Sequence, residues 1–211
     1  MKLKKLILTG IFINIFFINN LLCLVPAHQT FKKDKGSIKR SFLAGFLLGN
    51  YHIKDHRFER IYEKKRSIFG IELIYDLYRK HKYIIEGAFS FKFFSAEGYS
   101  TITKDYTKFS LYPYILNFRT KYDFSKIFKP FAGFGFDYYS YKEECPALKT
   151  TQGGKMGYHI EIGGSLKIPN LERVEIRGYL KYSTVNTQKD NIKVELGGTE
   201  FGMGIFYRFS I

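Results

Sequence analysis

From about residue 38 onward, apolar and polar residues alternate with a period of two over long segments. In IFGIELIYDLY, residues 68–78, Phe69, Ile71 and Leu73 fall on one face, and Glu72 and Asp76 fall on the other. Successive side chains of a β-strand point to opposite faces, so this alternation is typical of strands and excludes amphipathic helices over the same stretches. The sequence therefore predicts strands that each have one apolar and one charged face.

Eight such segments follow one another along the chain, at residues 40–51, 67–78, 82–95, 107–120, 129–142, 156–168, 172–183 and 194–210. A strand of a globular protein has about 5–6 residues, whereas a strand that crosses a bilayer needs roughly 9–11. The connections alternate strictly between short and long, with short ones at 79–82, 121–128 and 169–170. Short periplasmic turns, long outer loops and an even strand number are typical of outer-membrane barrels. We therefore predict an all-β fold, a closed antiparallel eight-stranded transmembrane up-and-down β-barrel.

The two faces of the strands suggest which side meets lipid. A sheet in hydrocarbon must close, because free backbone N–H and C=O groups find no water there. The charged face carries both signs, so its side chains can neutralise one another inside a narrow lumen. A soluble lipocalin-like barrel, with the apolar face inside, is the alternative. The predicted lumen charge network comprises Glu72, Asp76, Glu86, Lys92, Asp137, Glu161, Arg173, Glu175, Arg177, Glu200 and Arg208.

Two segments have two largely apolar faces, so their facing is harder to assign. In FSLYPYILNFRTKY (109–122) we turn Tyr114 and Leu116 outward, because this places Arg119 inside. Pro113 lacks a backbone donor and suggests a β-bulge. In the first segment, we expect Gly45 and Gly49 to face inward.

The first residues have the pattern of a secretory signal peptide. A lysine-rich head is followed by an apolar stretch and by Val25-Pro26-Ala27, so we predict a cleaved signal at 1–27, a periplasmic lead at 28–37 and the barrel at 38–211. An uncleaved membrane anchor is the alternative. After cleavage only Cys145 remains, so no intrachain disulfide is expected. The chain is strongly basic, with a net charge of +15, and in an exported protein this favours an anionic membrane surface over nucleic acid.

Three segments carry a resemblance to a known family: EFGMGIFYRF at the C-terminus, KPFAGFGFDYYSY (129–141) and LYPYILNFRTKY before it. Across 38–211 the chain resembles the small eight-stranded outer-membrane β-barrel proteins of Gram-negative bacteria, of the OmpA/OmpX-like, porin-family type. The resemblance implies the cell outer membrane as location. It also implies that the barrel-assembly machinery reads Tyr207 and Phe209, although Ser210 and Ile211 follow the aromatic end that most members have.

The sequence offers no convincing enzyme site. Some barrels of this size resemble lipid A deacylases, but YLKYSTVN (179–186) contains no histidine, and Ser183 has no basic partner nearby in the sequence. His159 and Glu161 share the inner face without a nucleophile. We therefore expect no catalytic residue, no metal ligand set, no cofactor and no enzyme activity.

The expected function is structural or one of surface interaction, with a lumen plugged by charged side chains. Alternatives are a surface adhesin or lipopolysaccharide-binding barrel, a narrow pore for small solutes and, less favoured, a lipid A-modifying enzyme or a soluble lipocalin-like carrier. As partners we expect a lipid bilayer and lipopolysaccharide, the barrel-assembly machinery and periplasmic chaperones, no nucleic acid, and a monomeric state. A basic outer loop is the candidate binding element, although such a charge run is commonly only a solvated surface. It contains Lys54, Arg57, Arg60, Lys64, Lys65 and Arg66.

Overall fold

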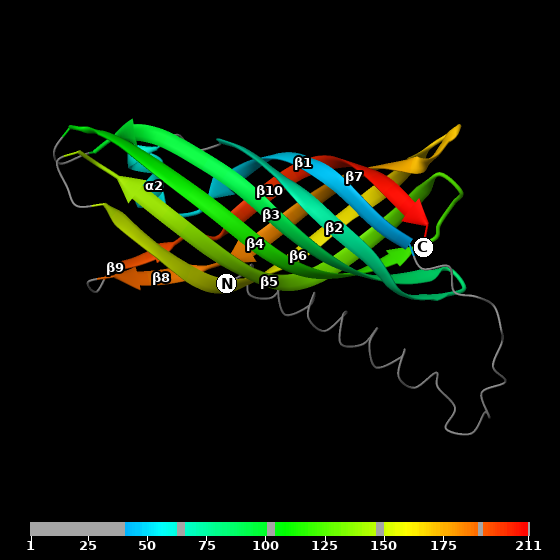
Figure 1. Cartoon of the computed structure of the whole chain (residues 1–211). Helices are drawn as coiled ribbons and strands as arrows, with labels where there is room; N and C mark the ends of the chain where they lie inside the picture. Colours follow the sequence, from blue (N-terminus) through cyan, green and yellow to red (C-terminus); the bar gives the residue numbers. More distant parts are fainter. Residues whose placement is uncertain (1–40, 63–65, 101–103, 147–149, 190–191, 211) are drawn as a thin grey trace, which may run out of the picture. The chain divides into compact units, whose positions relative to one another are not determined.

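The computed structural model describes residues 41–62, 66–100, 104–146, 150–189 and 192–210. Eight long strands form one closed antiparallel barrel in the order β1-β10-β7-β6-β5-β4-β3-β2 (Figure 1). The barrel strands are β1 (Ser41–Ile53), β2 (Arg66–Lys80), β3 (Tyr83–Tyr99), β4 (Tyr106–Tyr122), β5 (Phe128–Glu144), β6 (Thr151–Ile168), β7 (Leu171–Thr184) and β10 (Gly198–Ser210). The predicted fold class is confirmed.

The first and last strands close the barrel. Thirteen residue pairs join β1 to β10, from Ser41↔Ser210 to Ile53↔Gly198. The inner wall is crowded at this seam, because a Cβ on Gly45 would lie 2.5 Å from the Phe206 ring. Gly45 therefore faces inward, as the sequence predicts, and its missing side chain leaves room for a neighbouring aromatic ring.

The connections give the barrel two different ends. At the short-turn end, β2–β3, β4–β5 and β6–β7 are joined by tight turns, two of which place His81 and Asn170 at positive φ. The C-terminal strand also ends there (Figure 1). At the long-loop end lie helix α2 (His56–Ile61) and a separate hairpin of β8 (Asn186–Lys189) and β9 (Ile192–Glu195). Among the described residues, no helix is long and apolar enough to cross a bilayer.

Three details differ from the prediction. The last predicted segment, 194–210, is divided, because β9 ends at Glu195 and β10 begins at Gly198. The chain turns inward between them, where a Cβ on Gly197 would lie 2.5 Å from the Ser183 carbonyl oxygen. The expected bulge at Pro113 is wrong, because the β3–β4 register is the same on both sides of this residue. The predicted loop at 52–66 contains α2.

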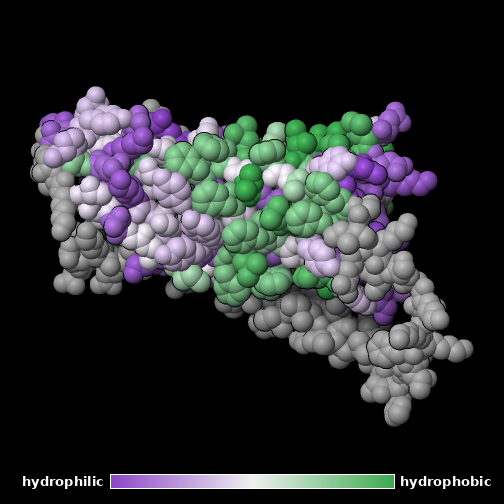
Figure 2. All heavy atoms as spheres, viewed as in Figure 1, coloured by the Kyte–Doolittle hydropathy of each residue, from purple (hydrophilic) through white to green (hydrophobic). Residues whose placement is uncertain are grey.

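Side-chain facing follows the pleat along the barrel strands except at two register shifts near the short-turn end, one in β2 between Asp76 and Tyr78 and one in β6 between Lys167 and Ile168. Outside, all eight barrel strands carry exposed apolar side chains that form a belt. Figure 2 shows one face of this belt, with hydrophilic residues gathered toward both ends of the barrel. Phe46, Phe134 and Ile205 are each more than half exposed in this belt. In β4, Tyr114 and Leu116 face outward and Arg119 is buried, as predicted. The predicted signal peptide and periplasmic lead lie outside the described residues and stay predictions.

Candidate functional site

The side chains inside the barrel form a charged lumen and an aromatic cap, and a smaller apolar cluster packs among the charges, where the Arg119 and Arg177 guanidinium groups lie over the Phe131 ring. This cluster consists of Leu43, Leu47, Ile74, Ala88, Phe131, Tyr179 and Phe206. The charged lumen occupies the short-turn half and the middle of the barrel. It consists of Glu72, Asp76, Glu86, Lys92, Arg119, Lys121, Asp137, His159, Glu161, Glu175, Arg177, Lys181, Glu200 and Arg208. The aromatic cap fills the long-loop end. It consists of Tyr51, Ile53, Phe58, Tyr62, Ile68, Phe94, Ala96, Phe109, Leu111, Tyr139, Val185 and Leu196.

The part of the charged lumen nearest the short-turn end centres on two carboxylates that face several cations. Glu86 accepts hydrogen bonds from both terminal nitrogens of Arg177, at 2.8 and 3.1 Å, and lies 2.7 Å from Lys121 Nζ. Glu175 contacts Arg177, Lys121 and, at the end of the barrel, Arg208. Paired, hydrogen-bonded geometry of this kind compensates for the cost of removing charges from water.

Arg119 joins two carboxylates across the middle of the lumen. Its Nε lies 2.7 Å from Glu161, and its two terminal nitrogens lie 2.9 and 2.8 Å from the two oxygens of Glu72. Ser90 and Asn117 donate further hydrogen bonds to these same carboxylates. All these side chains are buried, so Arg119 acts as a fork that ties β4 to β2 and β6.

A third group of charges lies directly beneath the aromatic cap. Glu200 forms an ion pair with Lys92 and accepts a hydrogen bond from the Tyr179 hydroxyl. It also lies 3.1 Å from Lys181 Nζ. His159 Nδ1 is 3.0 Å from Asp137 Oδ1, although the two groups are not aligned as a hydrogen bond. Glu200 is thus hydrogen-bonded to Lys92 and Tyr179, whereas the Asp137–His159 and Lys181–Glu200 pairs interact through proximity in a poorly solvated space.

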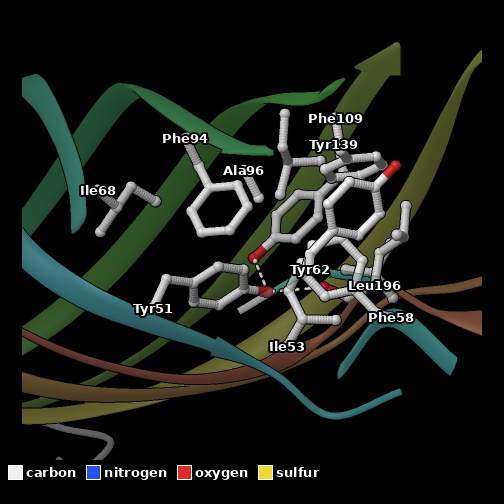
Figure 3. Close-up of a cluster of buried hydrophobic side chains, with 12 residues drawn as sticks. Tyr51, Ile53, Phe58, Tyr62, Ile68, Phe94, Ala96, Phe109, Tyr139 and Leu196 are labelled. Atoms are coloured by element: carbon white, nitrogen blue, oxygen red, sulfur yellow. Dashed lines mark hydrogen bonds between the residues drawn. The ribbon is translucent and has the colours of Figure 1, made fainter. Parts of the chain in front are cut away.

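The aromatic cap closes the long-loop end by packing (Figure 3). Phe109 lies edge-on to Phe58, with ring centroids 5.1 Å apart, and Phe94 packs edge-on against Tyr51 at 5.7 Å. The Tyr51 hydroxyl donates to the Leu196 carbonyl at 2.7 Å, which anchors the segment after β9. Such edge-to-face pairs stabilise an interior beyond their buried area.

Helix α2 belongs to this cap. Phe58, Ile61 and Tyr62 are three and four residues apart, so they share the face that packs into the barrel. The Tyr62 hydroxyl donates to Glu143 Oε1 at 2.7 Å and shares a 3.1 Å contact with Thr107. Burial raises the pKa of this phenol, so Tyr62 stays protonated and remains a donor. The basic segment is therefore more than a solvated surface at His56–Ile61, because the apolar stripe of α2 packs into the barrel.

Ten of the eleven residues predicted for the lumen network lie inside the barrel. Arg173 does not: it is exposed near the start of β7 and donates to the Tyr207 hydroxyl on the outer surface at 3.1 Å. Alternation gives it the inward parity of Glu175 and Arg177. The β6–β7 register, however, shifts between Lys167 and Ile168, so that Lys167 pairs with Glu175 but Ile168 pairs with Leu171, and the alternation is interrupted at Arg173. The prediction for Arg173 is wrong for this reason.

The predicted network also missed four interior side chains: Arg119, Lys121, His159 and Lys181. The alternation places Arg119, His159 and Lys181 on the inner face, so the signal for including them was present. Lys121 lies beyond the predicted end of its strand at residue 120, whereas β4 continues to Tyr122.

Strand pairing brings together a serine, a histidine and an aspartate that are far apart in the sequence. His159 is the register partner of Ser183, so the statement that Ser183 has no basic partner is wrong in three dimensions. Asp137 approaches His159 from the other side. The Ser183 side chain, however, is fully buried beneath the cap, where its Oγ contacts the Tyr139 hydroxyl at 3.1 Å and the Gly198 N–H at 3.3 Å. A nucleophile must be reached by its substrate, so this burial argues for a structural role.

The structure describes three side chains of the predicted basic outer loop, and these three do not form one cluster. Lys54 is exposed, with Nζ 3.3 Å from the Tyr182 hydroxyl and 3.8 Å from Glu195. Arg60 is exposed on α2, and Arg66 at the start of β2 donates to the Glu97 carbonyl at 3.4 Å. Lys64, Lys65 and the side chain of Arg57 lie outside what the structure describes. Within the described residues, no group of three or more His, Cys, Asp or Glu side chains is placed to hold a metal ion.

The predicted assembly signal lies on the outer surface of β10. Tyr207 and Phe209 are both more than two-fifths exposed, and their rings meet edge-on with centroids 4.9 Å apart. Phe209 also contacts Phe42 of β1 across the seam that closes the barrel.

Solved structures share this architecture, whereas no protein-family model and no curated protein matches the chain. The outer membrane protein OprG from Pseudomonas aeruginosa is similar with a TM-score of 0.55 and 13% identity, over 82% of this chain and 97% of that one. Ail, the attachment invasion locus protein of Yersinia pestis, has a TM-score of 0.53 at 13% identity, over 81% and 99%. Neisserial surface protein A has a TM-score of 0.53 at 13% identity, over 80% and 97%. At this identity the likeness shows the fold: the chain has the closed eight-stranded barrel of these proteins.

Proposed function

We propose that the protein is a non-enzymatic barrel of the Gram-negative outer membrane that does not conduct and that acts through its surface at the long-loop end. The observation that carries the proposal is the combination of an apolar belt outside with neutralised charges inside. A soluble carrier would need the opposite arrangement, with its apolar face around a ligand.

The belt supports a bilayer as the main partner. Apolar side chains such as Phe46, Phe134 and Ile205 would be costly in water and favourable in hydrocarbon. Tyrosines border this belt, with Tyr83 and Tyr207 toward the short-turn end and Tyr182 toward the long-loop end. Such rings suit the headgroup levels of a membrane.

The filled lumen argues against the narrow-pore alternative. An eight-stranded barrel is just wide enough for side chains to fill its interior. Here Arg119 spans the middle between Glu72 and Glu161, and the aromatic cap closes the long-loop end. An ion would have to disrupt buried ion pairs in the charged lumen and ring packing in the aromatic cap, which supports a closed barrel.

Polyanion binding at the long-loop end is the second candidate function. Lys54 and Arg60 are exposed there, and the structurally similar Ail has been solved with the heparin analogue sucrose octasulfate. We extend this to lipopolysaccharide phosphates as the ligand class. A Lys54→Gln/Arg60→Gln variant should bind vesicles that contain lipopolysaccharide several-fold less tightly than wild type, whereas Lys80→Gln at the other end should not.

Assembly would follow from the C-terminal strand. We propose that Tyr207 and Phe209 are read by the barrel-assembly machinery after periplasmic chaperones deliver the unfolded chain. Their exposure on β10, at the seam with β1, supports this role because the closing strand is accessible before the barrel is complete.

The bilayer proposal is tested by placing one charge at two depths on the same face of β10. Ile205→Arg should destabilise the barrel in vesicles by about 2–4 kcal/mol, and Thr199→Arg, closer to the long-loop end, by about 0–1 kcal/mol. Folding is followed by heat-modifiable gel mobility during a urea titration. Equal effects, or folding of the wild type without any amphiphile, would contradict the proposal.

Conduction is tested separately in planar bilayers. Wild-type barrel should leave the current at baseline, because both lumen regions are closed. Reproducible stepwise currents from the folded protein would instead support a narrow pore.

A further inference from the structure

The short-turn end has an open pocket of about 520 Å³. Four lysines line it: Lys82 in the β2–β3 turn, Lys126 in the β4–β5 turn, Lys129 at the start of β5 and Lys167 near the end of β6. Asp123 and Phe124 complete much of the wall. Four cations face one carboxylate here, whereas acidic and basic residues are mixed at the long-loop end. A concave site with this excess of ammonium groups favours an anion.

Backbone hydrogen bonds hold the pocket in shape. The Asp123 N–H donates to the Lys82 carbonyl at 2.7 Å, and the Lys167 N–H donates to the Ile127 carbonyl at 2.8 Å. Within the turn, Ser125 Oγ accepts a hydrogen bond from the Phe128 N–H at 2.9 Å. The β4–β5 turn is thus fixed against the neighbouring strands on both sides, so the backbone that carries the lysines is in place before any ligand arrives.

The lysines differ in how their charge is used. Lys129 is mostly buried and lies 2.7 Å from Asp123, so this pair belongs to the wall. Within the described part of the chain, Lys82, Lys126 and Lys167 have no carboxylate within ion-pair distance. Three ammonium groups therefore remain available to one anionic ligand.

Apolar side chains beside the pocket narrow the ligand class. Phe124 lines the pocket and is 69% exposed, and Ile127 and Phe128 next to it are 51% and 40% exposed. A free inorganic anion would use only the lysines. A lipid would use both features, with its phosphate among the lysines and its acyl chains against the apolar side chains.

We infer that this pocket binds the phosphate of an anionic phospholipid in the membrane leaflet at the short-turn end. The inference rests on the proposed membrane location, which places these turns at headgroup level. It assigns a specific lipid site to the end opposite the basic outer loop.

The test uses folded barrel in detergent and native mass spectrometry with phosphatidylglycerol as the probe. Wild type should retain phosphatidylglycerol in preference to phosphatidylcholine. Each lysine near an anionic lipid contributes roughly a fivefold factor, so Lys82→Gln/Lys126→Gln should retain about 25-fold less phosphatidylglycerol. The matched control, Lys80→Gln/Arg173→Gln, removes the same charge from exposed side chains at this end that do not line the pocket.

Heat-modifiable gel mobility shows whether each variant folds into vesicles. This measurement distinguishes failure of the lipid-site inference from failure of the proposed membrane location, since only the latter would prevent folding. If every variant folds and both double variants lose lipid equally, general attraction explains the binding and the site is refuted. If excess glycerol phosphate displaces the lipid completely, the pocket takes a small phosphate and the lipid assignment is refuted. Lack of any preference for phosphatidylglycerol in the wild type would refute it as well.

Discussion

The charged lumen and the aromatic cap lie on the same strands with the same inward parity, yet their polarity is inverted. In β3, Lys92 and Phe94 both face inward, the first into ion pairs and the second into the cap. The outer face changes in the opposite sense, from Phe91 and Phe93 to Glu97. This exchange of polar and apolar faces marks the level at which the strands leave the apolar belt. Between the belt and the long loops, the outer face meets water and the inner face can be apolar.

The two regions should respond differently to damage. In the charged lumen, stability depends on matched partners, and loss of one leaves another charge buried without compensation. In the aromatic cap it depends on filled volume, and loss of one ring leaves a void into which neighbours can partly relax. The four variants below test this difference, beginning with the one expected to be most damaging.

Arg119→Ala should be the most damaging change. It leaves Glu72 and Glu161 facing each other in the middle of the lumen, and breaking a buried pair in this way costs about 3–5 kcal/mol. The free energy of unfolding in vesicles, measured by urea titration, checks the value. Neutralising both partners as well, in Arg119→Met/Glu72→Gln/Glu161→Gln, should recover most of the loss. A cost below 1 kcal/mol for Arg119→Ala would mean that the lumen is well hydrated.

Phe109→Ala tests the cap in the same titration. The ring contacts Phe58, Tyr62 and Phe94, and removal of a buried phenylalanine ring costs about 3 kcal/mol. Phe58→Ala, alone and combined with Phe109→Ala, provides the control. Because the two rings touch, their effects should not be additive. Strict additivity would show that α2 does not pack on the barrel.

The inversion also explains which parts of the fold the sequence could predict. Strand number, barrel closure and facing followed from alternation wherever one face was charged, as in β2 and β7. Segment β4 had two apolar faces because it runs from the belt into the cap, and β1 because its inward Leu43 and Leu47 belong to the second apolar cluster. Helix α2 was missed because its apolar stripe is short and lies among charges. The Asp137–His159–Ser183 row could not be found, since it depends on inter-strand register.

Tyr51→Phe removes one hydroxyl from the cap, with its hydrogen bonds to the Leu196 carbonyl and the Tyr139 hydroxyl, and leaves the ring packing intact. The hydroxyl donates to the Leu196 carbonyl at 2.7 Å, so its loss should cost about 1 kcal/mol. Tyr114→Phe, on the exposed outer face, is the matched control and should change stability by less than about 0.5 kcal/mol. Equal values for the two variants would indicate that water reaches the interior of the cap.

The smallest effect is expected for Arg173→Ala, and its comparison with Arg177→Ala decides how far the charged lumen extends along β7. Arg173 has the same parity as Arg177 but donates only to the Tyr207 hydroxyl outside, at 3.1 Å. Its loss should therefore change the free energy of unfolding by less than about 0.5 kcal/mol. Arg177 binds Glu86 and Glu175, both buried, so the same substitution there should cost about 3–5 kcal/mol. Similar costs for the two arginines would place Arg173 in the lumen after all. A negligible cost for both would instead show that Lys121 and Arg208 alone suffice to neutralise these carboxylates.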